Sequence, residues 1–146
     1  MSDRPVFDQI NLVVSDMDAA VAFYRRLGVA LDVPTSDWPP GSGAHHVNAG
    51  DEEGAHFDLD DVPMARLWGD DALTAGATVL GFRLASRDAV DETFADLVAA
   101  GYKGRTAPYD AFFGARYAVV EDPDARPVGL MSPIDPAKKY VPSVSE

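Results

Sequence analysis

The chain has 146 residues, no cysteine and 47% hydrophobic residues, and its 24 acidic against 12 basic side chains give a formal net charge of −12. This composition excludes a largely disordered chain, and the missing cysteines exclude disulfides, thiolate nucleophiles and cysteine-based zinc sites. The negative charge repels phosphate backbones and anionic membrane surfaces, so we expect neither nucleic acid nor membrane as a partner.

The N-terminal segment predicts a strand followed by an amphipathic helix. In the run 7–14, Ile10, Leu12 and Val14 fall on one face and Gln9, Asn11 and Val13 on the other, which is the period of a strand with one face on a core. Asp16 is suited to cap a helix, because its carboxylate accepts amides of the first turn. Apolar side chains then recur at helical spacing up to Leu27, and Gly28 is suited to end the helix.

Short strand-like runs follow this helix, at residues 29–33, 44–49 and 56–60. Between the first two lies a loop rich in proline and glycine, which contains Trp38. Residues 61–77 read as a linker to the second half of the chain and contain Trp68, which would pin the linker to the sheet.

The second half repeats the first. A strand over 78–84 precedes Asp88, which is suited to cap a helix that ends at Gly101. Three further strands are predicted at residues 103–106, 116–121 and 128–132. A repeat of this length indicates a duplicated supersecondary unit. We therefore predict a single domain with modules at about 6–60 and 78–132, the linker 61–77, and a peripheral tail at 133–146.

This pattern resembles the vicinal oxygen chelate superfamily, which includes glyoxalase I, extradiol dioxygenases, fosfomycin resistance enzymes and bleomycin-binding proteins. The resemblance rests on residues 9–16, Phe23-Tyr24 with Leu27-Gly28, Phe113-Gly114, and Asp122-Pro123-Asp124. It implies an α+β fold in which two βαβββ modules form a curled, mixed β-sheet cup with helices on the outside. It also implies a homodimer.

The resemblance further implies four metal-ligand positions, which fall at Gln9, Asp58, Val79 and Gly129. Glutamine and aspartate offer oxygen ligands, whereas the side chains of valine and glycine offer no lone pair to a cation. We therefore expect no metal ion at this place and no cofactor.

An alternative places chemistry on His56 and Asp58, which share a face because they are two residues apart on a predicted strand. With Gln9 they could hold a displaced divalent ion, or they could act alone as an acid–base pair. The chain would then be a lyase, an isomerase or a dioxygenase. A polar pair that only forms hydrogen bonds in the cup wall is the simpler interpretation.

The remaining signal is a cup with aromatic loops that could stack on a planar ligand. Arg83 could bind an anionic or carbonyl group, or form a salt bridge, and Met131 offers an adaptable apolar wall. The predicted ligand-binding residues are Gln9, Asn11, Trp38, His56, Asp58, Arg83, Tyr109, Phe112, Phe113 and Met131.

We therefore expect a metal-independent protein that sequesters a hydrophobic or aromatic natural product, as in antibiotic resistance, rather than an enzyme. A structural or regulatory partner domain with a vestigial cup is a third alternative. No apolar run reaches transmembrane length and the first residues lack the apolar stretch of a signal peptide, so we expect a cytoplasmic protein.

Overall fold

The structure is a computed structural model that describes residues 4–27, 29–32, 36–49, 55–68 and 74–143. Its fold class is α+β, as predicted. The chain divides into two compact units. The first unit comprises Gln9–Thr78 and Pro142–Glu146, and the second unit comprises Met1–Asp8 and Val79–Val141.

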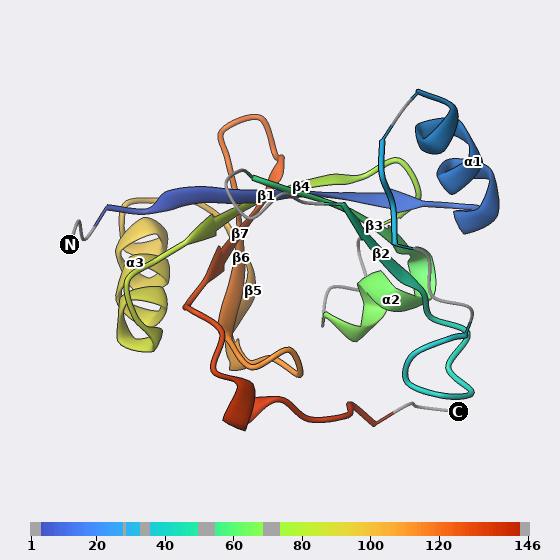
Figure 1. The fold of residues 1–146 in the computed structure, drawn as a ribbon. Coiled ribbons are helices and arrows are strands. Elements are labelled where there is room, and N and C mark those ends of the chain that lie inside the picture. Colours follow the sequence, from blue (N-terminus) through green and yellow to red (C-terminus); the bar gives the residue numbers. More distant parts are fainter. Residues whose placement is uncertain (1–3, 28, 33–35, 50–54, 69–73, 144–146) are drawn as a thin grey trace. The chain divides into compact units, whose positions relative to one another are not determined.

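The first unit is built on a mixed sheet. Its elements are β1 (Val6–Val14), α1 (Met17–Leu27), β2 (His46–Ala49), β3 (His56–Asp61) and α2 (Val62–Leu67). Strand β3 pairs in parallel with β1 and antiparallel with β2 (Figure 1). Helix α1 packs on one face, where Val21 meets Val47, Leu59 and Leu31 in a buried core. The opposite face of these strands carries mostly polar side chains.

The second unit also consists of a mixed sheet with a helix packed against it. Its elements are β4 (Thr78–Arg83), α3 (Arg87–Ala99), β5 (Gly104–Asp110), β6 (Arg116–Glu121), β7 (Pro127–Met131) and the short 3₁₀ helix η1 (Pro136–Lys138). Strand β7 is parallel to β4 and antiparallel to β6, which pairs with β5. Helix α3 lies beside these strands (Figure 1). Its Val90 is buried against Leu84, Ala118 and Leu130.

The helix caps were predicted correctly in part. The Asp16 carboxylate accepts the Ala19 amide at 3.0 Å, as expected of the residue that caps α1. The prediction that Asp88 caps the second helix is wrong. Ser86 holds this place, because its extended backbone lets its hydroxyl accept the Ala89 amide at 3.1 Å, and Asp88 lies within the first turn. Gly101 follows α3 at φ +100°, as predicted for a helix end.

The predicted strand at 29–33 is reduced, over its described part, to one bridge between Asp32 and Asn48. This segment instead forms hydrogen bonds with residues at the end of α1. The Val29 amide donates to the Tyr24 carbonyl at 2.9 Å, and the Arg25 guanidinium donates to the Leu31 carbonyl at 3.0 Å. Val33 lies outside the described residues.

Helix α2 was missed, because residues 61–77 were interpreted as a linker. The sequence Asp61-Val62-Pro63 carries the signal for a helix start, since an aspartate cap precedes a proline in the first turn. The Asp61 carboxylate accepts the Met64 amide at 3.0 Å. Trp68 is buried directly after the helix. No helix in the described ranges is long and apolar enough to cross a membrane.

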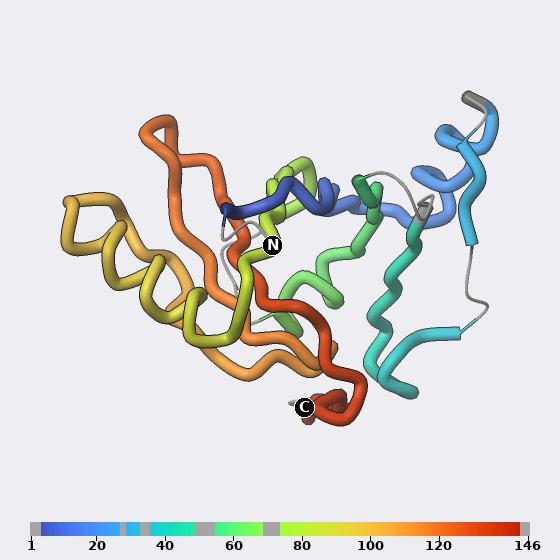
Figure 2. Tube along the Cα trace, turned by 60° about the vertical axis from the view of Figure 1, so that its left-hand side comes forward, coloured from blue at the N-terminus to red at the C-terminus, as the bar shows by residue number. Residues whose placement is uncertain are grey.

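The segment after β7 is tied to the second unit, although we expected it to be peripheral. Figure 2 shows this red segment beside the end of the orange strands. The Asp135 amide donates to the Gly114 carbonyl at 2.9 Å. The Tyr140 amide and hydroxyl donate to the carbonyls of Phe112 and Asp110 at 3.0 and 2.7 Å. The chain beyond β7 therefore covers the turn that joins β5 to β6.

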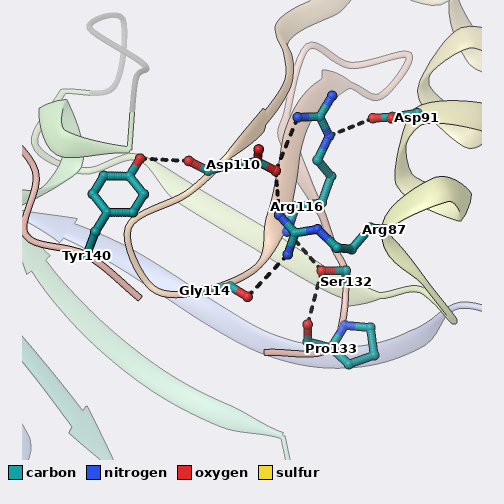
Figure 3. A network of polar contacts seen from close by, with 8 residues as sticks. All are labelled: Arg87, Asp91, Asp110, Gly114, Arg116, Ser132, Pro133 and Tyr140. Carbon is teal, nitrogen blue, oxygen red and sulfur yellow. Dashed lines mark hydrogen bonds and ion pairs between the residues drawn. The ribbon is translucent and has the colours of Figure 1, made fainter. Parts of the chain in front are cut away.

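Charged side chains brace this same turn from the helix side (Figure 3). Asp110 accepts from Arg87 of α3 and, at 3.3 Å, from Arg116 of β6. The Arg116 Nε donates to Asp91 at 2.8 Å. These contacts raise the pKa of Arg116, first through the hydrogen bond to Asp91, and lower that of Asp110, first through the hydrogen bond from Arg87. The network connects α3, β5 and β6.

Candidate functional site

The face of the first unit opposite α1 carries mostly polar side chains, and we call it the polar face. Because side chains alternate along a strand, the core residues Leu12, Val47 and Leu59 point to α1 and their neighbours point away. The polar members of this face are Gln9, Asn11, His46, Asn48, His56, Asp58 and Asp60, and buried Val13 lies among them opposite Asp60.

One end of the polar face holds a histidine–aspartate pair that we had not predicted. The strand register places His46 opposite Asp60, and the His46 Nδ1 lies 2.6 Å from the Asp60 Oδ1. The Asn11 amide donates to the other Asp60 oxygen at 3.0 Å and to Asp58 at 3.5 Å. Asp60 is 0% exposed, whereas the His46 side chain is 41% exposed. A buried carboxylate with both oxygens engaged therefore orients an accessible imidazole.

The surroundings make His46 a stronger base than an ordinary histidine. Desolvation, the largest single effect, lowers its pKa, but the hydrogen bond to Asp60 and the charges of Asp60 and Asp58 together outweigh it and raise the pKa above 6.5. A carboxylate that accepts from the imidazolium stabilises the charged form of the ring. The hydrogen bond to Asp60 and the nearby carboxylate charges are therefore the cause of the raised pKa of His46.

The neighbouring His45 pairs with Asp61 and not with Asp60. Its Nδ1 lies 2.7 Å from the Asp61 Oδ2, and its backbone amide donates to the Asp61 Oδ1 at 3.0 Å. Asp61 is the residue that caps α2. His45 therefore connects the start of β2 to the start of α2. The side chain of His46, the next residue, lies on the polar face.

The predicted residues of this unit do not include the pair. Asn11 and Asp58 are buried in the polar face, and Gln9 and His56 are opposite one another in the strand register. Trp38 is 40% exposed in the loop before β2, where its amide donates to the Ala44 carbonyl at 2.9 Å. Sequence reasoning missed the pair because only the strand register shows that His46 and Asp60 are opposite.

In the second unit, two positions that the resemblance assigns to metal ligands do not fit a metal ion. Val79 is 1% exposed and has a hydrocarbon side chain. A Cβ atom at Gly129 would lie 2.8 Å from the Tyr117 hydroxyl oxygen and 3.0 Å from the Tyr117 Cε2. The ring of Tyr117 therefore occupies the space into which a ligand side chain at Gly129 would project. Nowhere in the described ranges do three or more His, Cys, Asp or Glu residues form a group that could hold a metal ion.

Tyr117 belongs to an aromatic cluster, which we define as Tyr109, Phe112, Phe113 and Tyr117. Its rings meet edge to face, with centroid distances of 6.0 Å for Tyr109–Tyr117, 5.6 Å for Phe113–Tyr117 and 5.3 Å for Phe112–Phe113. Buried Met131 packs against the same rings. Phe112 is buried and therefore supports the cluster, whereas Tyr109 and Phe113 are partly exposed.

The remaining predicted residue, Arg83, forms an ion pair with Asp8 at 2.9 Å, which was one of its two predicted roles. The pair joins β4 to the first residues of β1 within the second unit. In the same place Phe7 and Phe82 meet edge to face at 5.7 Å. Arg83 therefore has a structural partner that competes with any ligand for its guanidinium.

Comparison with known protein families identifies the superfamily of this chain. The family model of the Glyoxalase/Bleomycin resistance protein/Dioxygenase superfamily matches residues 6–125, and the chain belongs to this superfamily. No curated protein sequence matches the chain.

Solved structures share the fold at low identity. A hypothetical protein from Bacillus halodurans is 16% identical, with a TM-score of 0.61 over 90% of this chain and 96% of that one. Methylmalonyl-CoA epimerase from Mycobacterium tuberculosis is 16% identical, with a TM-score of 0.57 over 88% of both chains. An NAD-dependent benzaldehyde dehydrogenase structure from Legionella pneumophila is 16% identical, with a TM-score of 0.58 over 85% and 96%. At this identity the likeness concerns the fold alone.

Proposed function

We propose that this protein binds a planar aromatic small molecule without using a divalent metal ion. The observation that carries the proposal is the Tyr117 ring, which fills the space beside Gly129 where a metal-binding side chain would otherwise stand. Val79, the other position in the same unit, adds only hydrocarbon. Sequestration of a natural product, as in antibiotic resistance, is the role that we assign to such binding.

The aromatic cluster supports the class of ligand. Tyr109 and Phe113 are partly exposed, and their rings are held at fixed angles by Tyr117 and Phe112. Rings that are held in place lose little conformational freedom when a flat ligand stacks on them. Trp38 belongs to the first unit and is 40% exposed there, so its role as a ligand-binding residue stays a separate prediction. The homodimer and the cytoplasmic location stay predictions.

Calorimetric titration with 9-aminoacridine tests this proposal. We expect the same affinity in the presence and absence of EDTA, because no metal ion takes part. Phe113→Ala should weaken binding about tenfold, equivalent to about 1.4 kcal/mol, because it removes an exposed ring of the cluster. Phe23→Ala is the matched control, since it removes an exposed phenylalanine of α1 outside the cluster.

Three results would contradict the proposal. They are an affinity that EDTA abolishes, one tightly bound ion per chain in protein purified without chelator, and equal losses of affinity in both phenylalanine variants. Either of the first two would favour a metal-dependent lyase, isomerase or dioxygenase.

A further inference from the structure

We propose that two copies of this chain associate through the exposed side of α1, with their two α1 helices antiparallel about a two-fold axis. The inference goes beyond ligand binding and names a surface, whereas the resemblance predicts only that a homodimer exists. It rests on the first unit and does not depend on the aromatic cluster of the second unit.

Helix α1 has an apolar side that packs on its own sheet and an exposed side that carries a large aromatic ring. Val21 is buried in the core, and Met17, Ala20 and Tyr24 pack against the same cluster. On the opposite side, four exposed residues recur at intervals of three or four, which is the spacing of one helix face. We call these residues the α1 surface, and they are Asp16, Ala19, Phe23 and Arg26. Phe23 is 63% exposed, so its own unit leaves most of this ring in water.

A hollow with a volume of about 450 Å³ lies next to Phe23. It is bordered by α1, by the end of β1 and by residues 75–77. Backbone hydrogen bonds hold this last segment in place, since the Val13 amide donates to the Ala77 carbonyl at 2.9 Å and the Gly76 amide donates to the Val13 carbonyl at 2.8 Å. An exposed ring therefore lies beside a space with a fixed border, and the lining of that space is mostly apolar.

The order of side chains along the α1 surface is complementary to its own reverse. In two antiparallel helices with a two-fold axis at the level of Val21, residues equally far before and after this position lie opposite each other. Phe23 then faces the partner's Ala19, which borders the partner's hollow. Arg26 faces the partner's Asp16. The two-fold axis repeats both contacts, so each ring meets a small side chain and each cation meets a carboxylate.

The charges of α1 favour a second copy as the occupant of this surface. Its first turn carries Asp18 after the capping Asp16, and its last turn carries Arg25 and Arg26. Arg25 donates to the Leu31 carbonyl of its own chain, whereas the side chain of Arg26 lies on the α1 surface. The net charge of −12 repels a second copy in most orientations. The antiparallel arrangement of α1 opposes this repulsion, because it brings opposite charges together at both ends.

The corresponding helix of the second unit does not have this property. Helix α3 carries Asp88 in its first turn and has no basic residue in its last turn. Two antiparallel α3 helices would therefore bring no cation to this aspartate. The distribution of charge selects α1, rather than α3, as the helix that pairs with its own copy.

Sedimentation equilibrium tests the proposal in about 0.15 M salt, which shortens the range of the general repulsion. Helix α1 has 11 residues and offers a small contact, so we expect a monomer–dimer equilibrium with a dissociation constant of about 1–100 µM. Phe23→Ala should raise this constant at least about tenfold, because it removes the ring at the centre of the contact. Arg26→Glu should raise it about fivefold, because like charges then meet at both ends.

Two variants are matched controls for these substitutions. Tyr102→Ala removes an exposed aromatic residue of the second unit. Arg66→Glu reverses an exposed charge in the last turn of α2. Both should leave the dissociation constant unchanged.

Chemical cross-linking tests the orientation of the two helices. The chain has no cysteine, so a single introduced cysteine can only link two copies. We expect a short bis-maleimide to join Ala19→Cys chains, because this position lies near the proposed axis. Ala95→Cys, at an exposed position of α3, is the matched control and should not be joined.

The proposal is overturned if the wild-type protein stays monomeric up to about 1 mM, a concentration well above the expected dissociation constant. It is also overturned if the α1 variants dimerise as tightly as their controls, or if Ala95→Cys is joined as efficiently as Ala19→Cys. Binding of 9-aminoacridine is measured separately, so failure of the aromatic site leaves this test intact, and the reverse also holds.

Discussion

Tyr117 and Gly129 are a residue pair in which a large side chain occupies the space of a missing one. The backbone of β7 can run beside β6 in this way only because position 129 has no Cβ. A side chain added to a well-packed site forces its neighbours to shift, which costs about 1–3 kcal/mol. The pair therefore determines both the local packing and the absence of a ligand atom at this position.

We predict that Gly129→Ala destabilises the protein by about 1–3 kcal/mol in urea unfolding. The penalty should be smaller in a Tyr117→Phe background, because that change removes the hydroxyl oxygen, the atom nearest to the new Cβ. The four proteins form a double-mutant cycle that cancels other effects of the lost hydroxyl. Equal penalties in the two backgrounds would mean that Tyr117 does not fill this space.

We predict that His46 makes stability depend on pH. Its pKa is raised in the folded protein above 6.5, so the native state binds its proton more tightly than the unfolded chain does. The stabilisation is fully present below about pH 6.5 and is lost as the pH rises through the folded pKa. Urea unfolding of wild-type protein and His46→Gln from about pH 5.5 to about pH 8.5 measures it. The difference in unfolding free energy should shrink as the pH rises, and a difference that grows would contradict the assignment.

At the residue scale, the sequence alone shows which side chains can supply a ligand atom, while metal independence stays a prediction. The lack of ligand atoms at Val79 and Gly129 follows from their identity alone. The pairing of His46 with Asp60 could not be predicted, because it depends on the register between β2 and β3, which the sequence does not specify. Conversely, Tyr117 was not singled out, because nothing in the sequence indicates that its ring leans over a glycine of the next strand.

At the scale of elements, the segment after β7 behaves as part of the second unit. Gly114 has a φ of +91°, and a Cβ there would collide with the Asp135 carbonyl oxygen. This glycine is required twice, once for its backbone conformation and once for the close approach of the following chain. Helices α1 and α3 and most of the strands were predictable from periodicity, whereas α2 was missed. This attachment could not be predicted, because residues 133–141 have no periodic pattern.

We predict that Gly114→Ala loosens this attachment. The matched control is Gly76→Ala, since Gly76 has a φ of +90° but open space around its Cβ position. Both variants pay the cost of a left-handed residue, about 1–2 kcal/mol, and Gly114→Ala should lose about 1–3 kcal/mol more. Chymotrypsin should cleave after Tyr140 faster in Gly114→Ala than in Gly76→Ala or wild type. Equal cleavage rates in all three proteins would contradict the role of this contact.

At the scale of the whole molecule, the dominant property is charge. A net charge of −12 creates a negative potential around the protein that acts beyond individual contacts. This potential was evident from composition alone. Its effect on ligand choice follows from electrostatics and needs no knowledge of which side chains touch the ligand.

We predict that the protein binds cationic 9-aminoacridine more tightly than anionic anthracene-9-carboxylate, a tricyclic of similar size. The preference should weaken as the salt concentration rises from about 0.05 M to about 0.5 M, because salt shortens the range of the potential. Calorimetry at several salt concentrations measures both affinities. Tighter binding of the anion at low salt would show that a local cationic group outweighs the overall charge.

Strand β1 is shared between the two units, and this determines where the chain can be cut. Its first residues, up to Asp8, belong to the unit that otherwise starts at Val79, where Phe7 contacts Phe82 and Asp8 binds Arg83. A fragment that starts at residue 79 therefore lacks part of its unit, namely the residues up to Asp8. Circular permutants or split halves of this protein should be functional only when that N-terminal peptide is supplied together with the C-terminal half.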